Sequence, residues 1–158
     1  TPIPFYTPVS ETRDLQREIF SRPFGRQLDL RLVEAYIQDY DKAKPGDIYV
    51  YADYVDYTSK QLLGEKDGTT AISAMILRTI MRKDENKAFS IDVNAYFINP
   101  STHTISISRS EDAKGIDIKK NERAEAVFKL PSHQLQVGDP QYEIAKLMYQ
   151  DLTNKKFD

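Results

Sequence analysis

Histidine is the side chain that most often acts as an acid, a base or a metal ligand near neutral pH. The chain of 158 residues contains two, His103 and His133. His103 stands beside an expected hairpin turn and His133 in a polar loop, and neither stands in a pattern that pairs it with a nucleophile. There is no cysteine to supply a thiolate or a metal-binding sulfur. We therefore expect no catalytic residue, no metal site and no cofactor.

Three aspartates, Asp47, Asp53 and Asp56, stand close together and could suggest a site for a hard cation or a glycosidase-like pair of carboxylates. On an extended strand Asp47 and Asp53 share one face but are roughly 20 Å apart, and Asp56 points to the other face. Charged residues also protect exposed strands from aggregation. We therefore interpret the three as solvated carboxylates, and an enzyme that uses carboxylates alone is the weakest of three function classes.

The segment GEKDGTT, residues 64–70, is superficially similar to a phosphate-binding loop that opens a helix. It lacks the lysine of that motif, and its glycine spacing is one residue short. An ordinary N-cap at Thr69 or Thr70 explains the segment better.

Arg78, Arg82 and Lys83 are candidates for binding an anion or an acidic partner. The alternative is that they pair with carboxylates of neighbouring elements, as charges at the edge of a helix commonly do. The net charge is −2 with both signs interspersed, so we predict no sequence-specific binding of nucleic acid.

Tyrosine is the unusual feature of the composition, because the chain contains ten tyrosines and no tryptophan. Tyrosine is enriched at protein interfaces. Prolines at positions 2, 4 and 8 also predict an extended arm over residues 1–9. We expect a protein interface among these residues: Ile3, Phe5, Tyr6, Tyr49, Tyr51, Tyr54 and Tyr57. The alternatives are an arm that packs on its own domain, and tyrosines that pack beneath N-terminal helices.

The segment Thr69–Lys83 organises the predicted fold. At 100° per residue its apolar side chains form two stripes on nearly opposite sides: Ile72, Met75, Ile76 and Ile80, and Ala74, Leu77 and Met81. A pattern that is apolar almost all round predicts a helix buried among other elements. We expect strands to cover this helix.

Two further helices are expected before it, over residues 10–20 and 29–41. Leucines alternate at positions 28, 30 and 32, so a short strand that enters the second helix is the competing interpretation. Residues 47–57 hold four tyrosines and three valines or isoleucines, which predicts a strand. Residues 58–68 are expected to form a loop.

Residues 88–98 and 103–110 predict a hairpin around the turn Asn99–Thr102. The apolar residues expected opposite one another are Phe89, Ile91 and Val93 on one strand and Ile105 and Ile107 on the other. Residues 115–119 predict another short strand.

Residues 123–130 fit a helix or a strand, and we favour a strand because Pro131 ends the segment abruptly. Asp139 as N-cap and Pro140 as first residue predict a C-terminal helix. Together the elements predict a single α+β domain over residues 10–158. It would contain an antiparallel β-sheet of about four to five strands around a buried central helix, with two N-terminal helices and one C-terminal helix.

The composition is ordinary for a globular chain, with 40% hydrophobic and 29% charged residues. No apolar run reaches the length of a membrane span, and peripheral contact with a membrane stays open. A chain without cysteine suits oxidising and reducing compartments alike, so the localisation is undetermined. The chain begins at Thr1 without a signal-like segment, and we expect a trimmed or processed product.

The expected order of strand, loop, buried helix, strand and hairpin is similar to the core of some matrix proteins of negative-strand RNA viruses. The resemblance covers about half of the chain, rests on the order of elements, and implies assembly. A subunit of a bacterial secretion complex or a phage particle fits the same features. We therefore expect a non-enzymatic structural or assembly protein that acts through protein–protein contacts and associates with itself. The alternative is a domain that binds a small ligand or a peptide in an apolar pocket.

Overall fold

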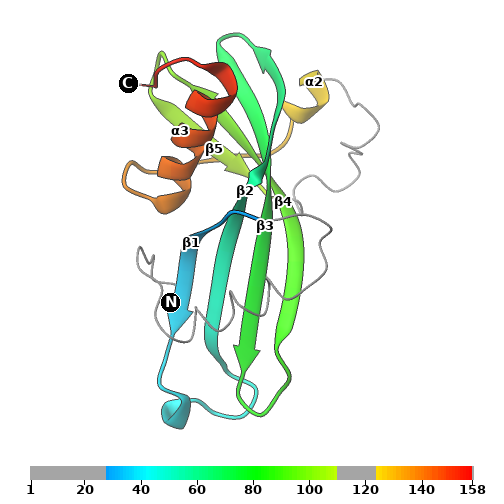
Figure 1. Ribbon diagram of the computed structural model, residues 1–158, viewed down its shortest axis with the longest axis vertical. Helices are drawn as coiled ribbons and strands as arrows, with labels where there is room; N and C mark the ends of the chain where they lie inside the picture. Colours follow the sequence, from blue (N-terminus) through cyan, green and yellow to red (C-terminus); the bar gives the residue numbers. More distant parts are fainter. Residues whose placement is uncertain (1–27, 110–123, 158) are drawn as a thin grey trace. The chain divides into compact units, whose positions relative to one another are not determined.

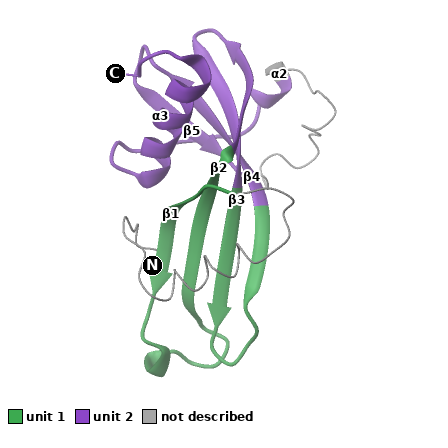
Figure 2. Ribbon diagram, in the orientation of Figure 1, with its two compact units in different colours: residues 1–58, 76–91 green, residues 59–75, 92–158 purple. Residues whose placement is uncertain are grey.

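The computed structural model describes residues 28–109 and 124–157. These residues form six strands that follow one another in the sheet in sequence order, two α-helices and a 3₁₀-helix (Figure 1). The chain divides into two compact units, which Figure 2 distinguishes by colour. In the described chain, unit 1 contains residues 28–58 and 76–91, and unit 2 contains the others.

Unit 1 consists of strands and one 3₁₀ turn in its described part. Strand β1 (Leu30–Ile37) pairs antiparallel with β2 (Ile48–Lys66), and η1 (Tyr40–Lys42) lies in the connection. The last part of β3 (Thr69–Arg82) and the start of β4 (Ala88–Asn99) complete the unit. One face of the β1–β2 pair is apolar and buried. Its residues include Val33, Ala35, Val50, Ala52 and Tyr54.

Residues 69–82 form strand β3, so the prediction of a central buried helix is wrong. Side chains on both faces of this strand are buried, as Ala71 and Ile72 show, each with no exposed surface. A strand buried on both faces is apolar at every spacing, including the helical one. The order of elements that resembled the viral matrix core therefore does not occur in this protein.

Residues 30–37 also form a strand where a helix was predicted. The strand of the competing interpretation is present, but it does not enter an α-helix. The helix predicted over residues 10–20 and the arm over residues 1–9 lie outside the described residues. The predicted α+β arrangement is thus wrong. The described chain is mostly antiparallel β-sheet, and its one long helix lies at the C-terminal end.

Strand β2 continues to Lys66, so the loop predicted over residues 58–68 is also wrong. Only Asp67 and Gly68 separate β2 from β3, with φ of 51° and 82°. Two consecutive residues with positive φ are typical of the type I′ turn that links the strands of a tight hairpin. The segment interpreted as the start of a helix is therefore the tip of a β-hairpin.

Replacing Gly68 with alanine is expected to lower the free energy of unfolding by about 1 kcal/mol, because a β-carbon disfavours positive φ. No other atom would lie within 4 Å of the new β-carbon, so the cost is conformational and not steric. Urea unfolding measures the loss. Gly64→Ala in β2 is the control, since Gly64 is not among the glycines with positive φ. Equal losses for the two variants would contradict the turn assignment.

In unit 2 the predicted hairpin around residues 99–102 is confirmed. Oδ1 of Asn99 accepts hydrogen bonds from the amides of Ser101 and Thr102, and β5 (Thr104–Ser108) follows the turn. The predicted pairing is wrong, because Ile105 lies opposite Ile98 and Ile107 lies opposite Tyr96. The part of β4 that pairs with β5 is Ala95–Asn99, which begins after Phe89, Ile91 and Val93.

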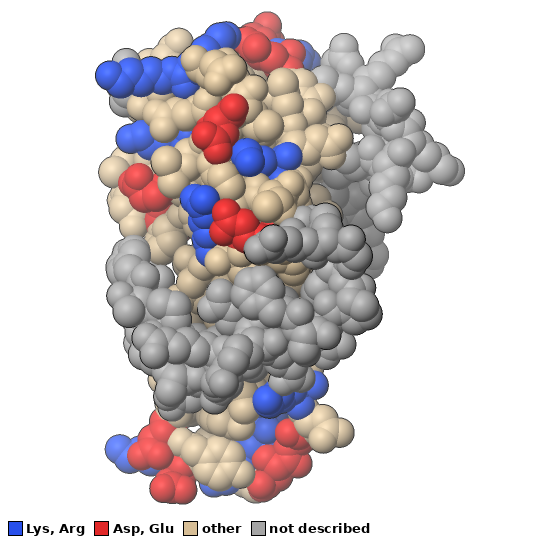
Figure 3. Space-filling model, viewed as in Figure 1, with Lys and Arg blue, Asp and Glu red and all other residues tan. Residues whose placement is uncertain are grey.

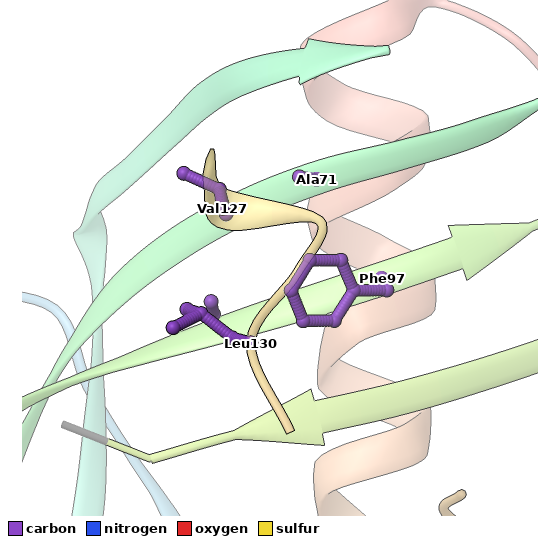
Figure 4. Close-up of a cluster of buried hydrophobic side chains, with 5 residues drawn as sticks. Ala71, Phe97, Val127 and Leu130 are labelled. Atoms are coloured by element: carbon purple, nitrogen blue, oxygen red, sulfur yellow. The ribbon is translucent and has the colours of Figure 1, made fainter. Parts of the chain in front are cut away.

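Residues 124–127 form the short helix α2 (Ala124–Val127), so the strand chosen for residues 123–130 is wrong. Val127 and the following Leu130 pack against Ala71 of β3 and Phe97 of β4 (Figure 4). This contact buries the side chains of Val127 and Leu130. The strand predicted over residues 115–119 lies outside the described residues.

The predicted C-terminal helix is confirmed as α3 (Pro140–Thr153), with Asp139 accepting a hydrogen bond from the amide of Gln141 at 2.8 Å. The two-residue strand β6 (His133–Gln134) precedes it and pairs with β5. The hydroxyl of Tyr142 in α3 donates to the carbonyl of His103, which fixes the helix to the end of the β4–β5 turn. The buried face of α3 includes Tyr142, Ile144, Ala145, Met148 and Tyr149.

Candidate functional site

The pairing of β1 with β2 gathers polar and aromatic side chains on one face of unit 1. Glu34 lies opposite Asp53, and Tyr36 lies opposite Tyr51. Alternate residues of a strand share a face, so these four side chains lie on the same side of the sheet. Their face is opposite to the one that carries Val33, Ala35, Val50, Ala52 and Tyr54.

The two tyrosines lie side by side and are only partly buried. The ring centroids of Tyr36 and Tyr51 are 6.2 Å apart, and the ring planes differ by 19°. The hydroxyl of Tyr51 donates a hydrogen bond of 2.7 Å to Oε1 of Glu34. Cross-strand pairing thus fixes the orientation of both rings.

Asp53 forms a two-point ion pair with Arg78 of β3. Nε of Arg78 donates to Oδ1 at 2.7 Å, and Nη2 donates to Oδ2 at 3.0 Å. The Asp53 side chain is 6% exposed and that of Arg78 is 39% exposed. The guanidinium therefore compensates a carboxylate that is almost entirely buried.

A shallow groove of about 370 Å³ lies beside the two rings, and we call it the tyrosine groove. It is lined by Tyr36, Gln38, Gly46, Asp47, Ile48, Tyr51 and Arg82. Its volume lies near the lower limit of known ligand sites. The size suits one side chain of a protein partner or a small molecule.

Two hydrogen bonds fix polar residues of the tyrosine groove. Nε2 of Gln38 donates to the carbonyl of Ile48 at 2.6 Å, and Nη1 of Arg82 donates to the carbonyl of Gly46 at 3.0 Å. Gly46 has a φ of 89°, which favours glycine at this position. The groove is therefore largely pre-formed in the unbound protein.

The pKa of the Tyr51 hydroxyl is raised well above its ordinary value, first by burial and then by the hydrogen bond to Glu34. The hydroxyl stays protonated near neutral pH and serves as a hydrogen-bond donor. The Asp53 carboxylate accepts two hydrogen bonds from Arg78. The polar groups of this face are thus fixed in pairs, which suits contact with a partner better than proton transfer.

The structure distributes the four candidate tyrosines of β2 between the core and the surface. Tyr54 and Tyr57 are buried, and the guanidinium carbon of Arg31 lies 3.6 Å from the ring centroid of Tyr57. Tyr49 is half-buried and packs edge-on against Tyr40 at 4.9 Å. Tyr51 is the member of the set that lines the groove.

Ile3, Phe5 and Tyr6, the interface candidates of the arm, lie outside the described residues. Sequence reasoning missed Tyr36 and Glu34 because it placed both on a helix. Their two-residue spacing, continued by Gln38, was the available signal that they share one face of a strand.

The three cationic candidates all contact other parts of unit 1. Arg78 binds Asp53, and Arg82 binds the Gly46 carbonyl. Nζ of Lys83 donates to the carbonyls of Tyr40 and Ala43 at 3.0 and 2.9 Å. Only the contact of Arg78 is the pairing with a carboxylate that the alternative gave, since Arg82 and Lys83 donate to backbone carbonyls. Binding of an anion stays a prediction. On the face in Figure 3, basic and acidic side chains lie beside one another, so the described residues form no large surface of one charge there.

Two of the three candidate aspartates differ from the prediction of solvated carboxylates. Asp47 is exposed, but Asp53 and Asp56 are buried, with Asp56 showing no exposed surface.

His103 and His133 are both exposed. Within the described ranges, no three His, Cys, Asp or Glu side chains lie together in a way that could hold a metal ion. Among the helices described, none has the length and apolar character needed to cross a membrane.

Comparison of the chain with protein-family models, curated proteins and solved structures finds no match.

Proposed function

We propose that the protein is a non-enzymatic assembly subunit that associates with a second copy of itself through the tyrosine groove. The observation that carries this proposal is the pair of half-buried tyrosines, Tyr36 and Tyr51, beside a pre-formed groove bordered by Arg82. Tyrosine and arginine dominate the binding energy of protein interfaces. Both rings are already oriented in the free protein, so little side-chain entropy is lost on association.

The fixed pairing of the polar groups supports binding over catalysis. Tyr51 donates to Glu34, Arg78 donates to Asp53, and Arg82 donates to the Gly46 carbonyl. A general acid or base needs a pKa near the working pH and access to the reacting atom. The Tyr51 hydroxyl, with its pKa raised by burial and by Glu34, does not meet the first condition.

Tyr36→Ser is expected to weaken self-association about tenfold, because it removes one ring from the centre of the proposed interface. Light scattering after size-exclusion chromatography, over a range of protein concentrations, measures the change. Tyr51→Phe keeps the ring, so we expect it to associate more tightly than Tyr36→Ser. A chain without residues 1–9 tests the predicted arm in the same measurement.

Val137→Ser is the matched control, because Val137 in unit 2 is 78% exposed and its replacement removes apolar surface outside the groove. Association of this variant should equal that of the wild type. Thermal melting of each variant separates weak association from partial unfolding. A wild-type protein that stays monomeric at high concentration, or a Tyr36→Ser variant that associates normally, would overturn the proposal.

The second candidate function is binding of a small molecule or a peptide in the same groove. The groove volume of about 370 Å³ is the observation that favours it. A monomeric wild-type protein whose groove residues respond to small aromatic fragments in an NMR titration would support this function over assembly.

A further inference from the structure

The basic side chains on the face of the tyrosine groove already have acceptors within unit 1. Arg78 is paired with Asp53, and Arg82 donates to the Gly46 carbonyl. On the same face of β1, Nη2 of Arg31 donates to Asp29 at 3.2 Å, and the guanidinium lies over the Tyr57 ring. The basic groups of this face are therefore used to stabilise the fold.

Glu34 differs from these groups because its partner is neutral. Its Oε1 accepts a hydrogen bond from the Tyr51 hydroxyl, and within the described part of the chain it forms no ion pair. The side chain is only partly exposed, so its charge is less screened than that of a fully solvated carboxylate. Glu34 is thus a carboxylate on this face that a partner could compensate.

The aromatic rings of unit 1 also differ in whether a cation already lies over them. Arg31 covers the ring of Tyr57, and Nζ of Lys83 lies 4.7 Å from the ring centroid of Tyr40. Among the described side chains, no cation lies over the ring of Tyr36 or Tyr51. A cation within about 6 Å of an aromatic face is attracted by the ring, and the attraction grows when water is removed.

We propose that Glu34, Tyr36 and Tyr51 form a subsite that receives a cationic side chain, lysine or arginine, from the bound protein. This inference rests on the proposed function, because it assigns the group that the bound protein places against Tyr36 and Tyr51, the two rings that line the tyrosine groove. Glu34 does not line the groove and lies beside it, bonded to Tyr51. The carboxylate supplies the charge, and the two rings supply faces for the alkyl stem and the cation. A guanidinium can donate to Glu34 while the Tyr51 hydroxyl keeps its own hydrogen bond, since a carboxylate accepts several.

The test is an NMR titration of the ¹⁵N-labelled chain of 158 residues with N-acetyl-L-arginine amide. We expect shifts of the amide signals of Glu34, Tyr36 and Tyr51. N-acetyl-L-citrulline amide has nearly the same shape without the charge and should bind about threefold more weakly or worse. The affinity of the arginine compound should fall as salt is added, because salt screens the attraction.

Glu34→Gln removes the charge and keeps an oxygen that can accept from Tyr51, so it should weaken binding of the arginine compound about threefold or more. Glu143→Gln is the matched control, because Glu143 is exposed on α3 in unit 2. Its affinity should equal that of the wild type.

Equal binding of the arginine and citrulline compounds would overturn the inference, as would the absence of any shift. Stronger binding of N-acetyl-L-glutamate amide would also overturn it and would point to Arg82 as the recognition group. If Tyr36→Ser blocks association while Glu34→Gln binds the arginine compound normally, this inference fails and the proposed function stands. If Tyr36→Ser associates normally, the proposed function fails instead.

Discussion

Replacement of Arg78 with methionine is expected to lower the free energy of unfolding by about 3 kcal/mol, because the Asp53 carboxylate would stay buried without its counter-charge. Two hydrogen bonds, of 2.7 and 3.0 Å, join these side chains in the wild type. Asp53 is only 6% exposed, whereas Arg78 is 39% exposed. Water around the arginine weakens the pair, so we place the loss at the lower end of the range for buried pairs.

Urea unfolding of four variants tests this prediction. Arg82→Met is the matched control, because Arg82 is an exposed arginine of the same strand that bonds only to a carbonyl, and it should cost less than about 1 kcal/mol. Asp53→Asn combined with Arg78→Met should recover part of the loss, since it removes the buried charge. Arg78→Lys should be intermediate, because an ammonium cannot form the two-point contact. Equal costs for Arg78→Met and Arg82→Met would contradict the role of the pair.

The strand β3 could not be distinguished from a helix by its apolar pattern alone. Its residues are buried on both faces over most of its length, so the alternation that marks a half-buried strand is missing. The sequence signal that distinguishes the two lies just before β3. Asp67-Gly68 is among the strongest sequence indications of a hairpin turn, and it had been interpreted together with a helix N-cap.

The strand β1 was misinterpreted for a different physical reason. A β-bulge between Leu32 and Glu34 inserts one residue, so the inward side chains change from even to odd positions. Leu30 is buried before the bulge, and Val33 and Ala35 are buried after it. Because the inward positions change at the bulge, the apolar residues of this segment are spaced as in a helix. The helical spacing gave no indication that Glu34 and Tyr36 lie on one face of a strand.

Features set by a few neighbouring residues were predicted correctly. The start of β2, the turn at residues 99–102 and the Asp139 cap of α3 are all local. The candidate site is not local, because it depends on strand pairing. Asp53 and Arg78 are separated by 25 positions in sequence, and Glu34 and Tyr51 by 17. With β1 and β3 taken as helices, these neighbours could not be identified.

The buried carboxylate of Asp56 is expected to control the stability of β1. Asp56 has no exposed surface and lies opposite Leu30, the first residue of β1. Its Oδ1 accepts hydrogen bonds from the amide of Asp29 at 3.2 Å, and from the amide and hydroxyl of Thr58 at 3.1 and 2.7 Å. The carbonyl of Asp29 in turn accepts from the amide of Tyr57. These bonds fix the chain where β1 begins.

Asp56→Ala should therefore lower the free energy of unfolding by about 3 kcal/mol, because it removes a buried carboxylate that accepts three hydrogen bonds. Asp56→Asn keeps an oxygen for the same donors and should cost less. Asp41→Ala, at an exposed aspartate of unit 1 whose φ is not positive, is the control and should cost under about 0.5 kcal/mol. Urea unfolding gives these values, and hydrogen exchange shows where the structure opens.

The stability of β1 bears on the proposed function, because β1 carries residues of the candidate site. β1 carries Glu34 and Tyr36, so loss of the Asp56 contacts should increase amide exchange in residues 30–37 more than in α3. An opened β1 displaces one wall of the tyrosine groove, and Asp56→Ala should weaken binding of N-acetyl-L-arginine amide although Asp56 does not line the groove. Uniform exchange throughout the protein, or unchanged binding with a fully destabilised β1, would show that Asp56 supports the fold without positioning the site.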